Sequence, residues 1–299
     1  MAEVTYRPAH VKGEVRIPPS KSAAHRALLS AALCKTPCRV GPIDHSADME
    51  ATLNGVCAMG GMVKAEENGV LCIAPGTAPQ SVTVDCGESG STLRFLIPVF
   101  AALGIEATFV GHGRLPERPI GVYTDLLPQH GVTVETAGGL PFHITGKLQS
   151  GDFRVPGNIS SQFITGLLFA LPLLKKDSTV TLTTPLESKG YIDLTIEVLA
   201  GFGVKIEEAE TGGHISGGQT YRADHYTVEG DWSQAAFFLS EAAVSGGPIR
   251  LLGLSETSLQ GDKACVHLWR QFGLSVTEEN GVYVAENKNT DKPYRGLHG

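Results

Sequence analysis

One pattern of apolar and polar positions occurs four times along the chain. In each copy a strand-like apolar residue leads through a tight turn into an apolar helix, and the copies start at Ile17, Val84, Val155 and Val228. The starts are separated by 67, 71 and 73 residues. Spacing this regular indicates duplication of one structural unit. The pattern therefore predicts a fold that is built from repeats.

Within the first copy, the periodicity of apolar residues predicts two helices and a hairpin. The helices are expected at residues 23–33 and 48–59. Two short strands at residues 62–64 and 70–73 flank Asn68-Gly69, a dipeptide typical of tight hairpin turns. The unit thus has the order β-α-β-α-β-β, and both helices can pack on one side of a four-stranded sheet.

The second helix of every copy is followed by glycine and then by an apolar residue. Glycine at this position supplies the left-handed conformation that ends a helix before the chain turns into a strand. The glycines are Gly60 with Gly61, Gly131, Gly203 and Gly273.

The number of repeats predicts how the chain divides into domains. Three repeats arranged about an axis would bury their helices against one another, which gives a first domain over residues 13–228. The second domain is expected to combine residues 1–12, with a leading strand at residues 4–8, and residues 229–299. It would hold one repeat only, so the chain is expected to be incomplete at its C-terminus. The crossovers near Gly13 and Gly230 are candidate hinges.

Composition narrows the classes of function. The formal charge of −7 and the 7% aromatic content argue against a nucleic-acid binder, which usually shows a basic face with stacking platforms. The N-terminus has no apolar segment of the signal-peptide kind, and the longest apolar runs, residues 95–105 and 164–174, are too short to span a bilayer. A cytoplasmic protein is expected. Six cysteines lack paired spacing and are interpreted as buried, reduced thiols: Cys34, Cys38, Cys57, Cys72, Cys86 and Cys265.

Each copy also places small or hydroxyl residues at the start of a helix. Free backbone N–H groups and the helix dipole favour an anion at that point. In the first copy, Lys21 and Arg26 add a mobile point charge and a forked donor, which suit a phosphate or a carboxylate. Residues 85–94 form a Gly-rich turn into a helix, but they lack the lysine of a P-loop and the last glycine of a nucleophile elbow.

Three further segments extend this theme. The Gly- and Pro-rich loop at residues 111–121 suggests a guanidinium that faces a cleft at Arg118, while residues 158–162 and 187–193 put polar side chains at further helix starts. Any one of these segments, taken alone, could be a simple helix cap, and the segment of Lys21 and Arg26 fits a capped helix with solvated cations about equally well.

Five segments together resemble the motifs of the 5-enolpyruvylshikimate-3-phosphate synthase family, in order, at the expected spacing and over essentially the whole chain. They are Pro19–Ser22 through Arg26, Gly87–Thr92 through Arg94, Glu117–Gly121, Ser160–Gln162 and Ser188–Asp193. The resemblance implies an α/β (α+β) fold, a two-domain inside-out α/β barrel of β-α-β-α-β-β repeats. The first three-repeat domain would be complete and the second partial.

The resemblance also implies a reaction. Members of the family transfer the carboxyvinyl group of phosphoenolpyruvate to the 5-hydroxyl of shikimate 3-phosphate and release phosphate, a step of the shikimate pathway towards chorismate and aromatic amino acids. The implied partners are these two small molecules, without nucleic acid, membrane, redox cofactor or obligatory metal. The implied state is a monomer.

Residue roles carry over from the matching motifs. Lys21 is the only catalytic candidate, since the general-base aspartate of the family is expected beyond the end of this chain. The implied contacts with phosphoenolpyruvate are Lys21, Gly90, Arg118 and Gln162. The implied contacts with shikimate 3-phosphate are Lys21, Ser22, Arg26, Ser160, Ser161, Gln162, Ser188 and Tyr191.

Because the family also draws a lysine and glutamate pair and further arginines from its second domain, the chain alone is expected to have negligible transferase activity. One alternative function is a non-catalytic fragment that binds phosphoshikimate. Another is an enolpyruvyl transferase that acts on a UDP-sugar, although residues 111–119 lack the reactive cysteine of that enzyme. A third, an RNA-end cyclase, fits poorly with the acidic charge and the few aromatic residues.

Overall fold

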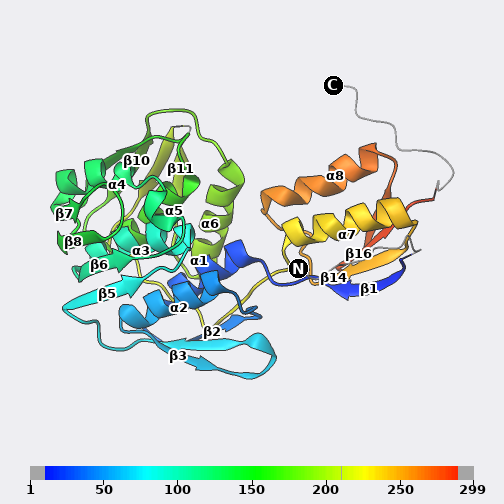
Figure 1. Cartoon of the computed structure of the whole chain (residues 1–299), viewed down its shortest axis with the longest axis horizontal. Helices are drawn as coiled ribbons and strands as arrows, with labels where there is room; N and C mark the ends of the chain where they lie inside the picture. The colour runs from blue at the N-terminus through cyan, green and yellow to red at the C-terminus, as the bar shows by residue number, and fades with distance from the viewer. Residues whose placement is uncertain (1–10, 210, 289–299) are drawn as a thin grey trace. The chain divides into compact units, whose positions relative to one another are not determined.

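The computed structural model describes residues 11–209 and 211–288, which form two compact units (Figure 1). The larger unit is Lys21–Val228, and the smaller unit joins the chain up to Ser20 with the chain from Glu229 onward. Each unit has an apolar core of its own. No helix in either stretch of described residues combines the length and the apolar character needed to cross a membrane.

The larger unit contains three four-stranded sheets, and each has one parallel pair of strands followed by an antiparallel hairpin. The first sheet has the order β13 (His225–Thr227), β2 (Cys38–Gly41), β4 (Leu71–Ala74), β3 (Met62–Ala65). The second has the order β5 (Ser81–Asp85), β6 (Glu106–Val110), β8 (Phe142–Gly146), β7 (Val132–Thr136). The third has the order β9 (Asp152–Val155), β10 (Ser178–Leu182), β12 (Gly212–Ile215), β11 (Glu207–Ala209).

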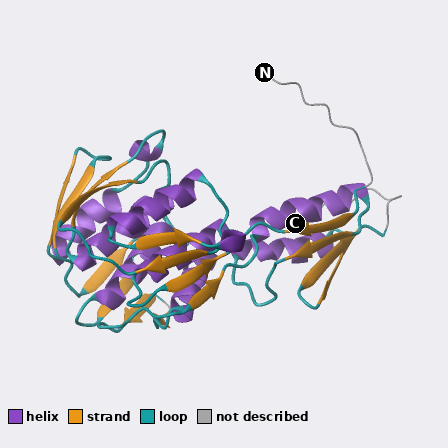
Figure 2. Ribbon diagram, turned by 90° about the horizontal axis from the view of Figure 1, so that it is seen from below, coloured by secondary structure: helices purple, strands orange, loops and turns teal. Residues whose placement is uncertain are grey.

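Six helices pack between these sheets. They are α1 (Lys21–Ala32), α2 (Ala47–Ala58), α3 (Gly90–Leu103), α4 (Gly121–Leu126), α5 (Ser161–Ala170) and α6 (Lys189–Gly201). Helix α3 is buried at every position except Ser91 and Leu103, and α5 at every position except Gln162. A helix that is apolar on all sides belongs inside a core. Helices α1, α3 and α5, which are the most buried, therefore form the centre, and the sheets lie outside (Figure 2), which confirms the inside-out α/β arrangement. Among the described strands, the three sheets do not pair into one closed barrel.

The elements predicted for the first repeat are confirmed with small shifts at their ends. Helices α1 and α2 and strands β3 and β4 occupy the expected segments. Asn68 and Gly69 have φ of 57° and 71°, as their hairpin turn requires. The predicted glycine caps are also confirmed, because Gly60, Gly131, Gly203 and Gly273 have φ of 93°, 81°, 76° and 97°.

The boundary between the units differs from the expected one at Gly13. Strand β1 (Gly13–Arg16) pairs in parallel with β14 (Ile249–Leu252) of the smaller unit, so residues 13–20 belong there. The outer strand of the first sheet is β13 instead, whose Tyr226 lies opposite Val40. The repeat pattern predicts that the strand directly before α1 belongs to the first sheet. In the structure, that position is occupied by β13, which follows the third repeat. The strand expected at residues 4–8 lies outside the described residues.

The smaller unit is one further repeat. Its sheet has the order β1, β14, β16 (Val282–Glu286), β15 (Ser275–Glu279), and its helices are α7 (Trp232–Ser245) and α8 (Ala264–Gln271). Trp232, Leu239 and Leu251 are fully buried in its core. Short 3₁₀ turns complete the chain at Glu67–Gly69, Leu115–Glu117, Leu127–His130, Leu171–Leu173 and Gly261–Lys263.

The prediction that all six cysteines are buried is wrong in part. All six are free thiols, and Cys34, Cys38 and Cys86 are buried. Cys57 is exposed, because it lies on the outer face of α2, and the remaining two are half-buried. Among residues 11–209 and 211–288, no group of His, Cys, Asp and Glu side chains is placed to hold a metal ion.

Candidate functional site

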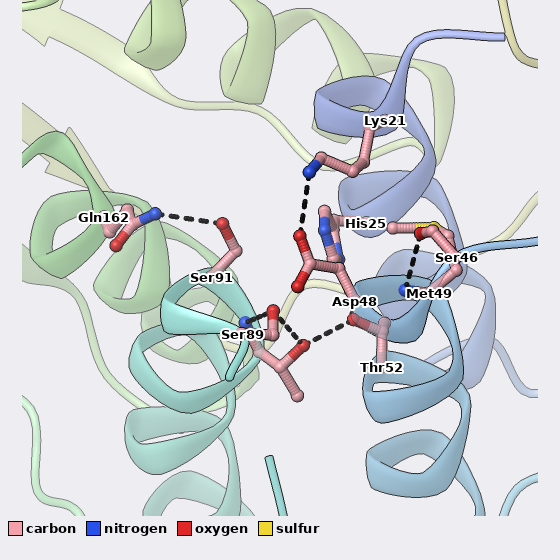
Figure 3. Close-up of polar contacts among 10 residues, drawn as sticks. Lys21, His25, Ser46, Asp48, Met49, Thr52, Ser89, Ser91 and Gln162 are labelled. Atoms are coloured by element: carbon pink, nitrogen blue, oxygen red, sulfur yellow. Dashed lines mark hydrogen bonds and ion pairs between the residues drawn. The ribbon is translucent and has the colours of Figure 1, made fainter. Parts of the chain in front are cut away.

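The start of α1 carries the first cation of the site. The Lys21 side chain is 56% exposed, and its Nζ lies 2.8 Å from Oδ2 of Asp48 near the start of α2 (Figure 3). Ser22 follows directly on the same turn, and its backbone carbonyl accepts a hydrogen bond from Arg26 at 2.7 Å. An exposed ion pair of this kind is worth little in free energy, so an anionic ligand can replace Asp48 as the partner of Lys21.

Arg26 lies one turn further along α1 and is 3% exposed. Its guanidinium donates to Oγ1 of Thr195 at 2.8 Å and to the carbonyl of Tyr191 at 3.2 Å, and it lies 5.2 Å from the centre of the Phe95 ring. Burial lowers its pKa to about 10, so the group stays charged at neutral pH. None of the ion pairs in the described part of the chain involves Arg26. A buried cation held only by neutral acceptors retains a strong preference for a nearby anion.

The start of α3 is the second part of the site. Ser89 caps this helix, and its hydroxyl accepts from the backbone N–H of Thr92. The next residue, Gly90, is buried and has no side chain. A Cβ atom at Gly90 would lie 2.9 Å from Nη1 of Arg118, 3.2 Å from Nη1 of Arg94 and 3.5 Å from Oε1 of Gln162. Two guanidinium groups and an amide therefore converge on one helix N-terminus.

Hydrogen bonds fix this convergence. Arg94 donates from Nη1 to Oε1 of Gln162 and from Nη2 to the carbonyl of Pro119 at 2.9 Å, while Gln162 donates to Oγ of Ser91 at 2.9 Å (Figure 3). Burial lowers the pKa of Arg94, and the neighbouring positive charge of Arg118 lowers it further. The Nε atom of Arg94 is buried without a hydrogen-bond partner. The sequence predicts Arg94 as part of a motif but not as a site residue, although a lone arginine within an apolar helix is a signal for such a role.

The starts of α5 and α6 complete the set. Ser160 caps α5 by accepting from the backbone N–H of Gln162 at 3.3 Å, and Ser161 is buried beside it. Ser188 precedes α6 with φ 57° and ψ 42°, a left-handed conformation that is strained for a residue other than glycine. Tyr191 is 44% exposed and presents its carbonyl to Arg26.

A buried chain of hydrogen bonds connects the starts of three helices. His25 Nδ1 lies 2.7 Å from Oγ1 of Thr52, Thr52 lies 2.7 Å from Oγ1 of Thr92, and Thr92 donates to Oγ of Ser89 at 2.8 Å. These side chains come from α1, α2, α3 and the residue that caps α3 (Figure 3). Burial lowers the pKa of His25 to about 3, with the charge of Arg26 as the second cause, so the ring is neutral.

The predicted residues thus fall into two connected groups. Hydrogen bonds join Ser22, Arg26 and Tyr191 around α1 and α6, and Lys21 precedes Ser22 on α1. Ser188 lies one turn before Tyr191, and the carbonyl of Ser188 accepts from the backbone N–H of Tyr191 at 3.1 Å. Gly90, Arg118 and Gln162 meet at α3, with Ser160 and Ser161 next to Gln162 on α5. Helices α5 and α6 are tied by Thr165 and Thr195 at 3.1 Å, and Thr195 also accepts from Arg26. No motif in the sequence predicts the contact between Thr165 and Thr195.

The chain thus combines a repeat-built, inside-out α/β fold with buried arginines gathered at helix starts, an arrangement that favours small, multiply charged anions. The family model for EPSP synthase (3-phosphoshikimate 1-carboxyvinyltransferase) matches residues 5–296. The chain belongs to the EPSP synthase family.

Individual relatives agree with this assignment. The 3-phosphoshikimate 1-carboxyvinyltransferase of Clostridium kluyveri is 44% identical over 294 residues, which cover 97% of this chain and 69% of that protein. The protein of the same name from Clostridium perfringens strain SM101 is 42% identical and is covered to 69%, and that of Clostridioides difficile is 41% identical and is covered to 67%. The chain therefore spans about two thirds of the length of these relatives.

The fold agrees as well. A solved structure of EPSP synthase from Acinetobacter baumannii superimposes with a TM-score of 0.82 at 24% sequence identity, covering 98% of this chain and 67% of that one. At this identity the likeness supports the fold alone.

Proposed function

We propose that this site binds shikimate 3-phosphate and phosphoenolpyruvate for transfer of the carboxyvinyl group to the 5-hydroxyl of shikimate 3-phosphate. Membership of the EPSP synthase family, a family of transferases, supports the reaction. The observation that carries the proposal is the convergence of Arg118, Arg94 and Gln162 on Gly90 at the start of α3.

Shikimate 3-phosphate is assigned to the starts of α1, α5 and α6. Buried Arg26 supplies a positive charge without a carboxylate partner, and exposed Lys21 supplies a second, mobile charge. Hydroxyl groups and helix N–H groups are good donors to phosphate oxygens. The residues assigned to this substrate are Lys21, Ser22, Arg26, Ser160, Ser161, Gln162, Ser188 and Tyr191.

Phosphoenolpyruvate is assigned to the Gly90 turn. Because Gly90 has no Cβ, an anionic group can approach the backbone and the two guanidinium groups together. Lys21 and Gln162 are assigned to both substrates, which places the reacting groups near each other. Two substrates that repel each other require several cations before they can meet, and the site provides Lys21, Arg26, Arg94 and Arg118.

The chemistry proceeds by addition and elimination. A proton is added to the methylene carbon of phosphoenolpyruvate, and the 5-hydroxyl oxygen bonds to the adjacent carbon and loses its proton, which gives a tetrahedral ketal. Loss of a proton from the methyl group and cleavage of the carbon–oxygen bond to phosphate then restore the double bond. The described residues bind, orient and neutralise charge in this scheme, and Lys21 is the candidate for stabilising charge on the departing phosphate.

Calorimetry with two matched glycine variants tests the binding roles. Shikimate 3-phosphate is titrated first, and phosphoenolpyruvate is then titrated into the complex. Gly90→Ala is expected to weaken phosphoenolpyruvate binding about tenfold, or about 1.4 kcal/mol, with little change for shikimate 3-phosphate. The added methyl group would occupy the position from which Arg118 Nη1 is 2.9 Å away.

Gly121→Ala is the control, because its added Cβ would have no neighbour closer than 4.0 Å. Equal phosphoenolpyruvate affinity in the two variants would contradict the assigned pocket. Release of phosphate that requires both substrates tests the transfer itself, and it is measured separately from binding. Binding without release would favour the alternative function of a phosphoshikimate-binding protein.

A further inference from the structure

A cavity of about 420 Å³ lies in the third repeat, and its wall includes Lys189 and Ile192 at the start of α6. It opens between α5 and α6 on one side and the sheet of β10, β12 and β11 on the other. Its walls are mainly branched apolar side chains: Ile164, Leu168, Val180, Leu182, Ile192 and Ile196. Leu182 and Ile196 are only partly buried, so the repeat leaves apolar surface open to this space.

Two polar side chains of the cavity wall, Thr184 and Lys189, have partners within the protein. Oγ1 of Thr184 accepts from the backbone N–H of Gly157 at 2.9 Å and donates to Oδ1 of Asn158 at 2.8 Å. The ammonium group of Lys189 at the rim pairs with Asp193 and lies 3.6 Å from Oε2 of Glu208.

No buried side-chain atom of the described lining lacks a hydrogen-bond partner. The buried side-chain atoms without a hydrogen-bond partner in the described residues belong to Ser30, Arg94, His214 and Trp232, and none of these residues lines the cavity. Apolar cavities bind apolar molecules, and one of about 150 Å³ already holds benzene. The lining therefore selects an uncharged, largely apolar ligand of bicyclic size.

Helix α6 connects the cavity to the anion site. Lys189, Ile192 and Ile196 line the cavity, whereas the carbonyl of Tyr191 and the hydroxyl of Thr195, on another face of the same helix, hold the guanidinium of Arg26. A ligand that fills the cavity contacts the face of α6 that carries Ile192 and Ile196. Such contacts restrict the motion of α6, and less conformational entropy is then lost when a second ligand binds at Arg26.

We propose that this cavity is a binding site for an uncharged apolar molecule and that its occupation strengthens anion binding at Arg26. The second part rests on the proposed function, and the first part does not. The coupling is reciprocal, so the anion must strengthen binding in the cavity by the same factor.

The test of the site is calorimetry with 2-naphthol, which is uncharged at neutral pH. Saturable binding with one site and a Kd of about 1 mM or tighter is expected. Ile196→Trp fills the cavity and is expected to weaken binding at least tenfold, and Ile206→Phe, at another lining position, should do the same if the first variant fails to fold. Val244→Trp is the control, because Val244 is 83% exposed on α7.

Two outcomes overturn the site: no saturable binding to the native chain, or equal binding to the filled variants. Binding of 2-naphthoate as tight as that of 2-naphthol overturns the assigned ligand class. For the coupling, saturating 2-naphthol is expected to raise the affinity for shikimate 3-phosphate at least threefold. Unchanged affinity overturns the coupling alone, whereas no binding of shikimate 3-phosphate in the absence of 2-naphthol contradicts the proposed function and leaves the cavity result standing.

Discussion

Buried arginines are the residues that most clearly separate this site from an ordinary set of helix caps. Arg26 and Arg94 are 3% and 7% exposed, and they donate hydrogen bonds to hydroxyl, amide and backbone oxygens. A phosphate or carboxylate oxygen in place of such a neutral acceptor adds attraction between opposite charges, and it can accept two parallel N–H bonds from one guanidinium. The fold thus keeps these charges available for a ligand.

His25 gives the protein a stability that depends on pH. Its pKa is about 3 in the folded chain, chiefly through burial, against an ordinary histidine pKa of 6.5. Between these values the unfolded chain binds the additional proton, so the free energy of unfolding falls as the pH falls below 6.5. A loss of about 2 kcal/mol is expected between pH 7 and pH 5 from this residue. Urea unfolding followed by far-UV circular dichroism at these pH values measures it.

His25→Asn is expected to remove most of this pH dependence. The burial-lowered pKa of His130 contributes in the same direction and remains in the variant. His112→Asn, at an exposed position, is the matched control and should behave like the native chain. If native and His25→Asn proteins lose the same free energy of unfolding on acidification, His25 is not the group responsible.

At the scale of elements, the site depends on how three helix starts are held together. Thr52 on α2 contacts both His25 on α1 and Thr92 on α3, so a single hydroxyl joins three helices. In a buried environment such a chain is stable only while each member keeps its partner.

Thr52→Val tests this connection. Valine keeps the shape of threonine but leaves His25 Nδ1 and one side of Thr92 without a hydrogen-bond partner, which is expected to cost about 1–3 kcal/mol. Chemical denaturation followed by far-UV circular dichroism gives the free energy of unfolding. Thr52→Ser, which keeps the hydroxyl, should retain most of the stability. A valine variant as stable as the serine variant would show that the chain contributes nothing measurable.

The sequence predicts many of the helices, strands and turns, because the signals for them are local. Apolar periodicity placed α1 and α2, Asn68-Gly69 placed the first hairpin, and the glycine caps ended the second helices. The long-range pairings were not predictable, because β13 pairs with β2 and β1 with β14 across most of the chain. The contact between Thr52 and Thr92 joins hydroxyls from separate helices, and no local pattern marks it.

Among the site residues, sequence predicted Lys21, Arg26, Gly90, Arg118 and Gln162 through motifs that combine charge with helix starts. The structure brings Gly90, Arg118 and Gln162 together, and it places Arg26 against Tyr191. It adds Arg94 and Thr195, whose importance depends on packing between helices rather than on neighbours in sequence. The specific substrate contacts stay predictions.

At the scale of the whole molecule, the chain has two cores that share no residues. Both tryptophans of the sequence, Trp232 and Trp269, belong to the smaller unit. Tryptophan fluorescence therefore reports on that unit alone, while far-UV circular dichroism reports mainly on the larger one.

Core truncations should separate the two units. Leu251→Ala removes a fully buried side chain from the smaller core and is expected to cost about 2–5 kcal/mol there. It should lower the urea midpoint seen by fluorescence and leave the main dichroism transition in place. Leu167→Ala, at an equally buried position of the larger core, should do the reverse. Parallel shifts of both signals in each variant would instead indicate one cooperative unit.

Strand β13 completes a sheet whose other strands are made much earlier in synthesis. While the ribosome is still translating the second and third repeats, Cys38–Gly41 has no parallel neighbour and exposes an open edge. Nascent chains at this stage are expected to engage chaperones, and the first repeat should become resistant to protease only after His225–Thr227 has left the exit tunnel.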